Sequence, residues 1–151
     1  MPDLALANDW QGRVLQVTDG DTLVVEHNGQ KEKLRVAEID APEHGQPFFE
    51  EAKAYATRLL DKQMVWIHEK ERDRYGRMVG WVSRKGLEDF GAEMVRSGLA
   101  WRHIHYSKSA SLARLEKEAR QRKVGLWSQP DPTPPWVWKH EHRKRGGHAK
   151  E

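Results

Sequence analysis

The most constraining feature of this sequence is a close succession of short β-type segments near its N-terminus, each ended by a strong turn signal. Residues 10–18 and 22–26 are rich in β-branched and aliphatic side chains, and Asp19-Gly20-Asp21 between them is a turn sequence. Asn28-Gly29 is the strongest short hairpin signal in the chain and leads into a third strand over residues 31–39. The chain is therefore expected to begin with three strands joined by tight turns.

Farther along the chain, two more strand patterns alternate with helical ones. Residues 63–69 and 78–82 are predicted strands. Apolar side chains recur every three or four positions over residues 48–60 and 109–122, and residues 87–96 form a further helical segment. Five short strands with an early hairpin are typical of a small barrel of the oligonucleotide-binding (OB) type. We therefore expect an α+β fold in which a five-stranded OB-type β-barrel carries about three helices packed on its outside.

The length of 151 residues corresponds to about one domain, which we place at residues 10–128. Residues 1–9 are expected to be a disordered leader, and the Ala-x-Ala pattern that ends residues 4–7 resembles the end of an export signal. This pattern predicts a secreted or periplasmic protein and leaves a cytoplasmic location open. The Pro- and Trp-rich residues 129–138 are expected to form a strap, and residues 139–151 a basic, mobile tail.

Charge and composition limit the ways in which the chain can bind a partner. No apolar run reaches the roughly 18 residues of a membrane span, so no membrane partner is expected. Cysteine is absent, which excludes disulfides and leaves oxygen or histidine ligands for any metal. The net charge of +3 arises entirely in residues 139–151, and the rest of the chain balances to zero. The body must therefore bind phosphate groups through a few well-placed arginines.

Three clusters of polar side chains stand out because they could carry chemistry. They are Asp19-Gly20-Asp21-Thr22, Arg35 with Asp40-Ala41-Pro42-Glu43, and Asp73-Arg74-Tyr75-Gly76-Arg77. Taken singly, each cluster is typical of an ordinary turn, a loop or an exposed hairpin. Their occurrence in this order, at spacings that fit one barrel, indicates a common site.

The two aspartates Asp21 and Asp40 lie at the ends of strands that are predicted to be neighbours. Two adjacent carboxylates repel each other unless a cation lies between them, and calcium accepts oxygen ligands of this kind. Arg35 and Arg77 match the paired oxygens of a phosphodiester group, whose charge increases when water attacks phosphorus. Glu43, on a loop restricted by proline, could orient or deprotonate that water.

The three clusters, in this order, resemble the staphylococcal nuclease family. The similarity continues through Leu99-Ala100 and Gly125-Leu126-Trp127-Ser128, and it extends over roughly residues 12–128. The resemblance implies a calcium-dependent phosphodiesterase that cuts DNA and RNA by in-line attack of water and leaves 3′-phosphate ends. It also implies a monomer with no obligate protein partner, which prefers single-stranded nucleic acid because its contacts need unpaired nucleotides.

The resemblance implies a metal site formed by Asp21, Asp40 and Ala41. The two aspartates match calcium-binding carboxylates, and the residue after Asp40 supplies a backbone carbonyl to the ion. That residue is Ala41 here where the founding member of the family has threonine, so the carbonyl is kept and a hydroxyl is lost. Calcium is therefore the implied cofactor, with other divalent ions as alternatives.

The resemblance also implies catalytic roles for Arg35, Glu43 and Arg77. Both arginines match phosphate-binding residues of the family, and Glu43 matches the general base or water-positioning residue. Tyr75 and Tyr106 match positions near the nucleotide-binding pocket, so together with the two arginines they are the predicted substrate-binding residues. The loop that follows Glu43 is several residues shorter than in the founding member.

Two alternatives remain open at this stage. The first is a catalytically inactive nuclease-like module that binds nucleic acid or protein, although such modules usually lack the acidic or arginine residues that are all present here. The second is a zinc site at His103-Ile104-His105, which would need further ligands, so these histidines are expected to lie at the surface. Ile104 also stands where the family has a second tyrosine.

Overall fold

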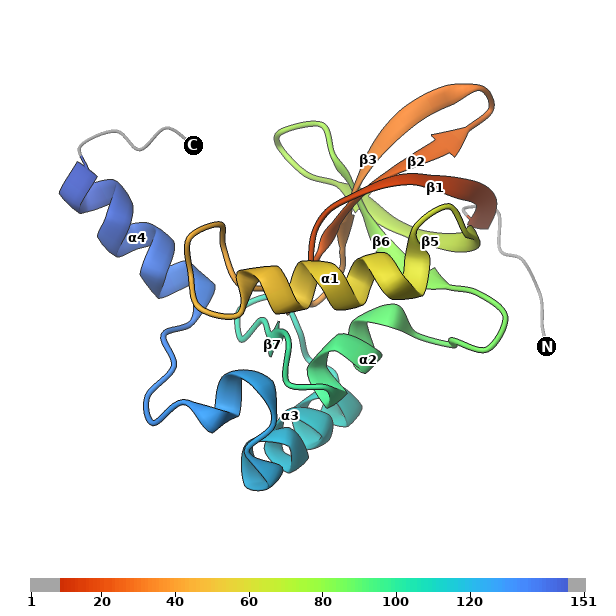
Figure 1. Cartoon of the computed structure of the whole chain (residues 1–151). Coiled ribbons are helices and arrows are strands. Elements are labelled where there is room, and N and C mark those ends of the chain that lie inside the picture. Colours follow the sequence, from red (N-terminus) through yellow and green to blue (C-terminus); the bar gives the residue numbers. More distant parts are fainter. Residues whose placement is uncertain (1–8, 147–151) are drawn as a thin grey trace.

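The computed structural model describes residues 9–146 and contains a closed five-stranded barrel with helices grouped at one end of it (Figure 1). The barrel strands are β1 (Asp9–Asp19), β2 (Thr22–His27), β3 (Gln30–Val36), β5 (Met64–Arg72) and β6 (Met78–Ser83). Their order around the barrel is β1-β2-β3-β6-β5, and all pairings are antiparallel except that of β3 with β6. This arrangement confirms the predicted α+β fold with an OB-type barrel.

Aliphatic side chains that alternate along the strands fill the interior of the barrel. In β2, Leu23 and Val25 are fully buried, and their neighbours in the strand are more exposed. Leu34 in β3 and Val65 and Ile67 in β5 are also fully buried. Because successive side chains of a strand point to opposite faces, this alternation places one set in the core. Each such side chain contributes about 1.5–3 kcal/mol through the apolar surface that it removes from water.

The helices in the described part of the chain are α1 (Phe49–Leu60), α2 (Phe90–Arg96), α3 (Ala110–Arg122) and α4 (Pro135–Gly146), and a 3₁₀ helix covers Gly125–Ser128. The first three correspond to the three predicted helices. Asp89 immediately precedes helix α2, and its carboxylate accepts a hydrogen bond from the Ala92 amide at 3.0 Å. Ser109 immediately precedes helix α3, and its hydroxyl accepts one from the Leu112 amide at 3.1 Å. Both are standard N-terminal caps.

The third predicted strand, residues 31–39, is interrupted in the structure. Strand β3 ends at Val36, and Glu38 adopts a left-handed conformation with a φ of 70°. A short strand, β4 (Ile39–Asp40), then pairs with β7 (Trp101–Arg102) outside the barrel. The Glu38 carboxylate accepts hydrogen bonds from two side chains far along the chain, which stabilises this uncommon conformation. Periodicity alone carries no signal for such a turn.

Residues 135–146 form helix α4, where the sequence predicted the end of a strap and a tail without helical structure. Proline suits the first turn of a helix, since its missing amide hydrogen would have no partner there. The ring of Trp136 lies 6.5 Å from that of Trp101, edge to face, so the start of α4 is held against the body. Helix α4 has no apolar stripe along its length, and its sequence therefore contains no periodic signal of a helix.

The ends of the chain were the subject of two expectations that the structure does not address. Residues 1–8 and 147–151 lie outside the described residues, and with them lie the export-like pattern and the end of the basic tail. Strand β1 begins at Asp9, one residue before the expected domain boundary. Between residues 9 and 146, no helix has the length and apolar character needed to cross a membrane.

Glu93 in α2 forms a polar contact with α1 that should contribute pH-dependent stability. Its carboxylate accepts hydrogen bonds from the Arg96 guanidinium at 2.6 Å and from the Tyr55 hydroxyl at 2.5 Å. These bonds, those from Arg96 above all, lower the pKa of Glu93 from 4.5 to about 2. Because the pKa is lower in the folded protein, the stabilisation is fully present above pH 4.5 and is lost as the pH falls toward 2.

Glu93→Gln should therefore lower the free energy of unfolding by about 1–2 kcal/mol at pH 7, since the charged hydrogen bonds become neutral ones. Urea titrations of the variant and the wild type at pH 7 and at pH 3 measure this difference. We expect the difference to narrow at pH 3. A difference of equal size at both pH values would show that the Glu93 charge is not its cause.

Candidate active site

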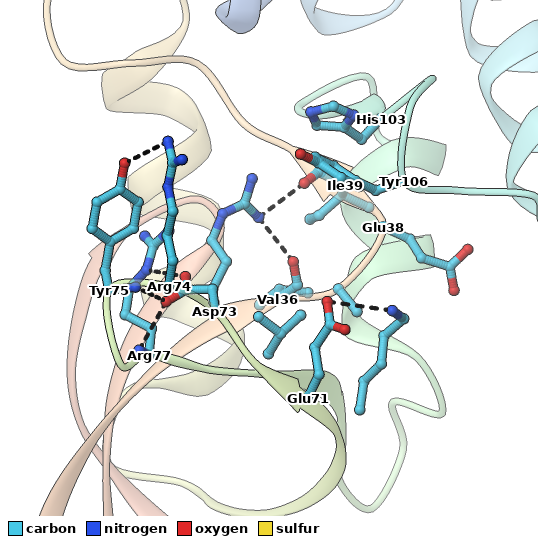
Figure 2. A pocket seen from close by; sticks show the side chains of 14 residues that line it. Val36, Glu38, Ile39, Glu71, Asp73, Arg74, Tyr75, Arg77, His103 and Tyr106 are labelled. Carbon is cyan, nitrogen blue, oxygen red and sulfur yellow. Dashed lines mark hydrogen bonds and ion pairs between the residues drawn. The ribbon is translucent and has the colours of Figure 1, made fainter.

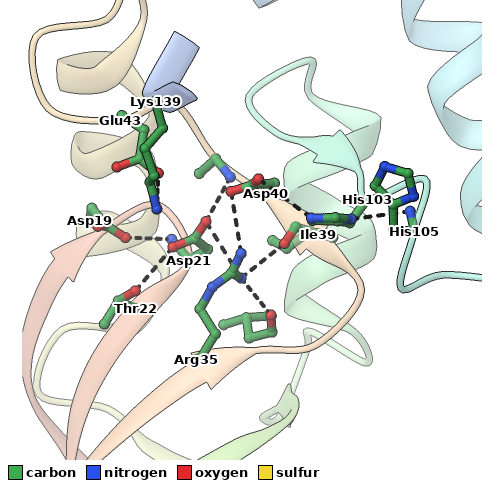
Figure 3. Close-up of polar contacts among 12 residues, drawn as sticks. Asp19, Asp21, Thr22, Arg35, Ile39, Asp40, Glu43, His103, His105 and Lys139 are labelled. Carbon is green, nitrogen blue, oxygen red and sulfur yellow. Dashed lines mark hydrogen bonds and ion pairs between the residues drawn. The ribbon is translucent and has the colours of Figure 1, made fainter. Parts of the chain in front are cut away.

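The structure brings the two aspartates predicted to bind metal together beside the Arg35 guanidinium (Figure 3). Asp21 lies in the turn between β1 and β2, Asp40 ends β4, and Arg35 lies near the end of β3. Arg35 Nη1 is 3.5 Å from Asp21 Oδ2, and Arg35 Nη2 is 3.3 Å from Asp40 Oδ1. Asp21 is 6% exposed and Asp40 is 7% exposed. Since buried carboxylates need a compensating charge, both depend on this guanidinium.

The turn sequence Asp19-Gly20-Asp21 is fixed by its close approach to the chain after Asp40. Asp21 Oδ2 accepts a hydrogen bond from the Ala41 amide at 2.7 Å, and the Asp21 amide donates to Asp19 Oδ1 at 3.0 Å. A Cβ atom added at Gly20 would lie 2.7 Å from the Cβ of Ala41. Glycine is therefore required for steric reasons, because any side chain would separate the two loops that carry the aspartates.

The guanidinium of Arg35 is held in place by backbone carbonyls as well as by the aspartates. Its Nη1 donates to the carbonyl of Val36 at 2.8 Å and to that of Ile39 at 2.9 Å. These carbonyls lie where the chain leaves the barrel and enters β4. The turn that interrupts the predicted third strand thus also fixes the position of the arginine.

The titration behaviour of the three aspartates reflects an excess of negative charge. Burial, followed by the charge of Asp21, raises the pKa of Asp40 to about 8, and the same two causes raise the pKa of Asp19 to about 8. Burial also opposes the ionisation of Asp21, but the Arg35 charge and hydrogen bonds to Asp19, Ala41 and Thr22 hold its pKa below the usual value. Three carboxylates thus share one guanidinium, and the site would be stabilised by further positive charge.

The residues present fit a hard divalent cation at this point. Carboxylate oxygens are the ligands that calcium prefers, and a doubly charged ion would offset the repulsion among the aspartates. Ala41, which is 1% exposed, lies next to both predicted ligands, so its carbonyl could serve as a third. Within residues 9–146, no three His, Asp or Glu side chains are grouped to hold a metal. An ion bound by Asp21, Asp40 and Ala41 would therefore take its other ligands from water or substrate.

A cavity of about 470 Å³ borders the Arg35 side chain (Figure 2), although Asp21 and Asp40 are not among the described residues that line it. All four predicted substrate-binding residues line it, namely Arg35, Tyr75, Arg77 and Tyr106. Lys70 and Arg74 add positive charge to its wall, and Glu38, Glu71 and Asp73 add negative charge. Arg35 is the residue common to both halves of the site, because it lines the cavity and contacts Asp21 and Asp40. The arrangement can thus hold an anionic group on one side of Arg35 and a cation on the other.

Unlike Arg35, Arg77 forms its ion pair with an aspartate outside the predicted metal site. Its Nε donates a hydrogen bond to Asp73 Oδ2 at 2.8 Å, and Asp73 Oδ1 accepts one from the Arg77 amide at 3.0 Å. In Figure 2, Arg77 stands beside Asp73 and Tyr75. The hairpin between β5 and β6 therefore presents Arg77 to the cavity. Arg77 forms its ion pair with Asp73, which is not one of the predicted metal ligands.

Glu43 lies in the loop between β4 and α1, close to the aspartates. Its carboxylate pairs with Lys139 of α4, with Glu43 Oε2 at 3.5 Å from Lys139 Nζ (Figure 3). Its charge also contributes to the raised pKa of Asp40, which places it within electrostatic reach of that carboxyl. The predicted general base is thus at the edge of the site and half-buried.

The expectation of surface histidines is wrong for His103 and holds for His105. Strand β7 ends at Arg102, so His103 and His105 do not alternate on a strand. His103 is 8% exposed, and its ring centroid lies 4.9 Å from that of Trp136. Burial, followed by the Arg35 charge, lowers its pKa to about 4, so the imidazole is neutral at pH 7. Its Nε2 lies 3.9 Å from Asp40 Oδ2, too far for a hydrogen bond.

Several residues of this region were given no role by the sequence. Asp19 belongs to the Asp19-Gly20-Asp21-Thr22 motif. A second aspartate so close to Asp21 was the signal that could have identified it as part of the site. Gln46 and Lys139 carried no such signal, because their contacts with the Glu43 loop depend on segments far apart in the chain.

Residues 33–129 match the family model described as "Staphylococcal nuclease homologue". The chain is 40% identical over 141 residues to a protein of Shigella flexneri named micrococcal nuclease, covering 87% of this chain and 81% of that one. It is 40% identical over 135 residues to an uncharacterized endonuclease of Escherichia coli O157:H7, covering 89% and 88%. A third such protein, from Haemophilus influenzae, is 33% identical over 132 residues, covering 87% and 74%.

Proposed function

The chain belongs to the staphylococcal nuclease family, and on that premise we propose that it is a calcium-dependent phosphodiesterase that hydrolyses DNA and RNA to 3′-phosphate products. The observation that supports this most directly is the position of Arg35. It contacts two buried aspartates and also lines a cavity that Arg77 and two further cationic side chains line with it. A scissile phosphate in that cavity would lie between guanidinium groups and a site suited to a hard cation.

In the proposed reaction, Arg35 and Arg77 bind the non-bridging oxygens of the phosphate and stabilise the charge that develops on them. The ion pair with Asp73 restricts the Arg77 side chain, so that less conformational entropy is lost when substrate binds. Glu43 orients or deprotonates the water that attacks phosphorus in line with the leaving oxygen. Calcium, when bound at Asp21 and Asp40, supplies Lewis acidity and a template for the attacking water.

Two tyrosines support a preference for single strands. Tyr75 is 71% exposed and Tyr106 is 73% exposed, and both line the cavity. Exposed aromatic rings beside arginines that can bind phosphate can stack on bases, and only unpaired bases offer both faces. Ile104, which is 52% exposed, stands where the family has another tyrosine near Tyr106. It therefore offers an apolar contact without stacking. Base recognition should therefore be weak.

The alternative of a catalytically inactive module is less well supported. Such a module would have no reason to keep Asp19 and Asp40 buried beside Asp21, because their raised pKa values mean that they destabilise the fold above their ordinary pKa. A site of this kind is instead expected where function requires it. The intact set of aspartates, arginines and Glu43 therefore favours the enzyme.

A metal-dependence assay with analysis of product ends tests the proposal. The purified protein should degrade single-stranded DNA and RNA in the presence of calcium, lose this activity in EGTA, and regain it when calcium is restored. The products should carry 3′-phosphate and 5′-hydroxyl ends. A polynucleotide kinase should therefore label their 5′ ends without prior phosphatase treatment. Cleavage that continues unchanged in EGTA would refute the calcium requirement, and 5′-phosphate ends would refute the proposed bond cleavage.

A further inference from the structure

The loop that carries Glu43 is bound to the C-terminal part of the chain through Gln46. The Gln46 side chain is 6% exposed and uses both ends of its amide. Its Oε1 accepts a hydrogen bond from the Glu43 amide at 2.8 Å, and its Nε2 donates to the carbonyl of Thr133 at 2.5 Å. One buried side chain therefore connects the backbone of the predicted general base to a segment 87 residues away in sequence.

Two further contacts join the same segments. Gly45 has a φ of +90°, and a Cβ atom added there would lie 3.6 Å from the ring of Trp138, so the first turns of α4 pack against the loop. Lys139 pairs with the Glu43 carboxylate at 3.5 Å, and its charge also opposes the rise in the pKa of Asp40. Lys139 is 55% exposed as a side chain, so this ion pair is screened by water and should contribute little by itself.

We propose that residues 133–139 form a C-terminal clamp that positions Glu43, with Gln46 as the positioning residue through which the clamp acts. The match to the family model ends at residue 129, so the clamp is formed by residues beyond the matched region. This inference rests on the proposed function, because positioning matters only if Glu43 acts on the attacking water. A displacement of a catalytic group by about 1 Å can lower a rate by up to about 100-fold, so fixing the loop that carries Glu43 preserves the rate.

Gln46→Met is the main test, because methionine matches the length of glutamine but cannot form either hydrogen bond. We expect kcat on single-stranded DNA to fall by about 10-fold to 100-fold, with KM and calcium affinity changed by less than about 2-fold. In a Glu43→Gln background the same change should cause no further loss, since the clamp acts through Glu43. Gln63→Met, at an exposed glutamine before β5, is the matched control and should leave all these values unchanged.

Amide hydrogen exchange tests the clamp without relying on activity. The Glu43 amide should exchange faster in Gln46→Met than in the wild type or in Gln63→Met, because its acceptor is lost. Should Gln46→Met not fold, Trp138→Ala, at a half-buried position of α4, should loosen the same loop and reduce kcat in the same direction.

Either of two results would overturn the clamp: unchanged exchange at the Glu43 amide, or an equal loss of kcat with and without Glu43→Gln. The failure of the proposed function would look different. In that case the wild type would be inactive, or Glu43→Gln would be as active as the wild type, whatever the exchange data show.

Discussion

Replacing Asp40 with asparagine should remove most of the nuclease activity and at the same time stabilise the folded protein. Substitution of groups that only support a metal ligand typically costs 10-fold to 100-fold in affinity or activity, so loss of a ligand carboxylate should lower kcat/KM by at least about 100-fold. Asparagine keeps an oxygen that can accept the Arg35 hydrogen bond at the same place. The loss should therefore reflect missing charge at the metal site, measurable as weaker calcium binding by calorimetry.

The gain in stability follows from the titration of Asp40. Burial and the charge of Asp21 raise its pKa from 3.8 to about 8. Because the pKa is higher in the folded protein than in the unfolded one, the wild type loses stability as the pH rises from 3.8 toward 8. In urea titrations with EGTA at pH 7, Asp40→Asn should be more stable than the wild type by about 1 kcal/mol or more, and near pH 3 the two should agree.

Asp61→Asn is a suitable control, since Asp61 lies at the end of α1 and, among residues 9–146, forms an ion pair only with exposed Lys62 at 3.9 Å. It should change neither activity nor the difference in stability between pH 7 and pH 3. If Asp40→Asn kept the wild-type kcat/KM, Asp40 would not be a metal ligand for the reaction. If Asp40→Asn were less stable than the wild type at pH 7, the contacts of the Asp40 carboxylate would stabilise the fold by more than its burial and the repulsion among the aspartates destabilise it.

Arg77→Ala should lower kcat by about 100-fold to 1,000-fold, the usual effect of removing a group that stabilises charge in the transition state. Calcium affinity should be unchanged, because the ion-pair partner of Arg77 is Asp73 and not a predicted metal ligand. This separates Arg77→Ala from Asp40→Asn, in which calcium binding is weakened. Rates at saturating substrate, with calorimetry of calcium binding, measure both quantities.

Arg77→Lys should restore only part of the rate, since an ammonium group cannot bind two phosphate oxygens and Asp73 in one planar arrangement. Arg114→Ala, at an exposed arginine of α3, is the matched control for the loss of one positive charge. A wild-type rate in Arg77→Ala would leave the transition-state role without support. An equal loss in Arg114→Ala would indicate a general effect of charge on nucleic-acid binding.

The barrel strands were predictable because their signals are local. Alternation in β2 and the Asn28-Gly29 turn specify a hairpin without reference to the rest of the chain. Helix α4 was not predictable in this way. Its start is held by the packing of Trp136 against Trp101. A contact between residues so far apart in the sequence produces no periodic pattern.

The candidate site shows the same division. Asp21, Arg35, Asp40 and Glu43 could be selected from the sequence because their chemistry and order are distinctive, and the structure brings them to one place. The neighbouring residues that set the burial and charge of these side chains could not be predicted from the sequence. The burial of His103 and the contact of Lys139 with Glu43 arise only when β7 and α4 dock beside β4 and its following loop.

The residue types of the site, the barrel strands and the periodic helices α1 and α3 could be identified from local sequence, because these depend on neighbours a few positions away. The groups that compensate the buried aspartates, the contacts that hold Arg77, and the link from Gln46 to Thr133 became visible only in the folded chain. The physical reason is that charge compensation and hydrogen bonding act through space over a few ångströms. Contacts between segments as far apart as 87 residues are therefore absent from any local pattern.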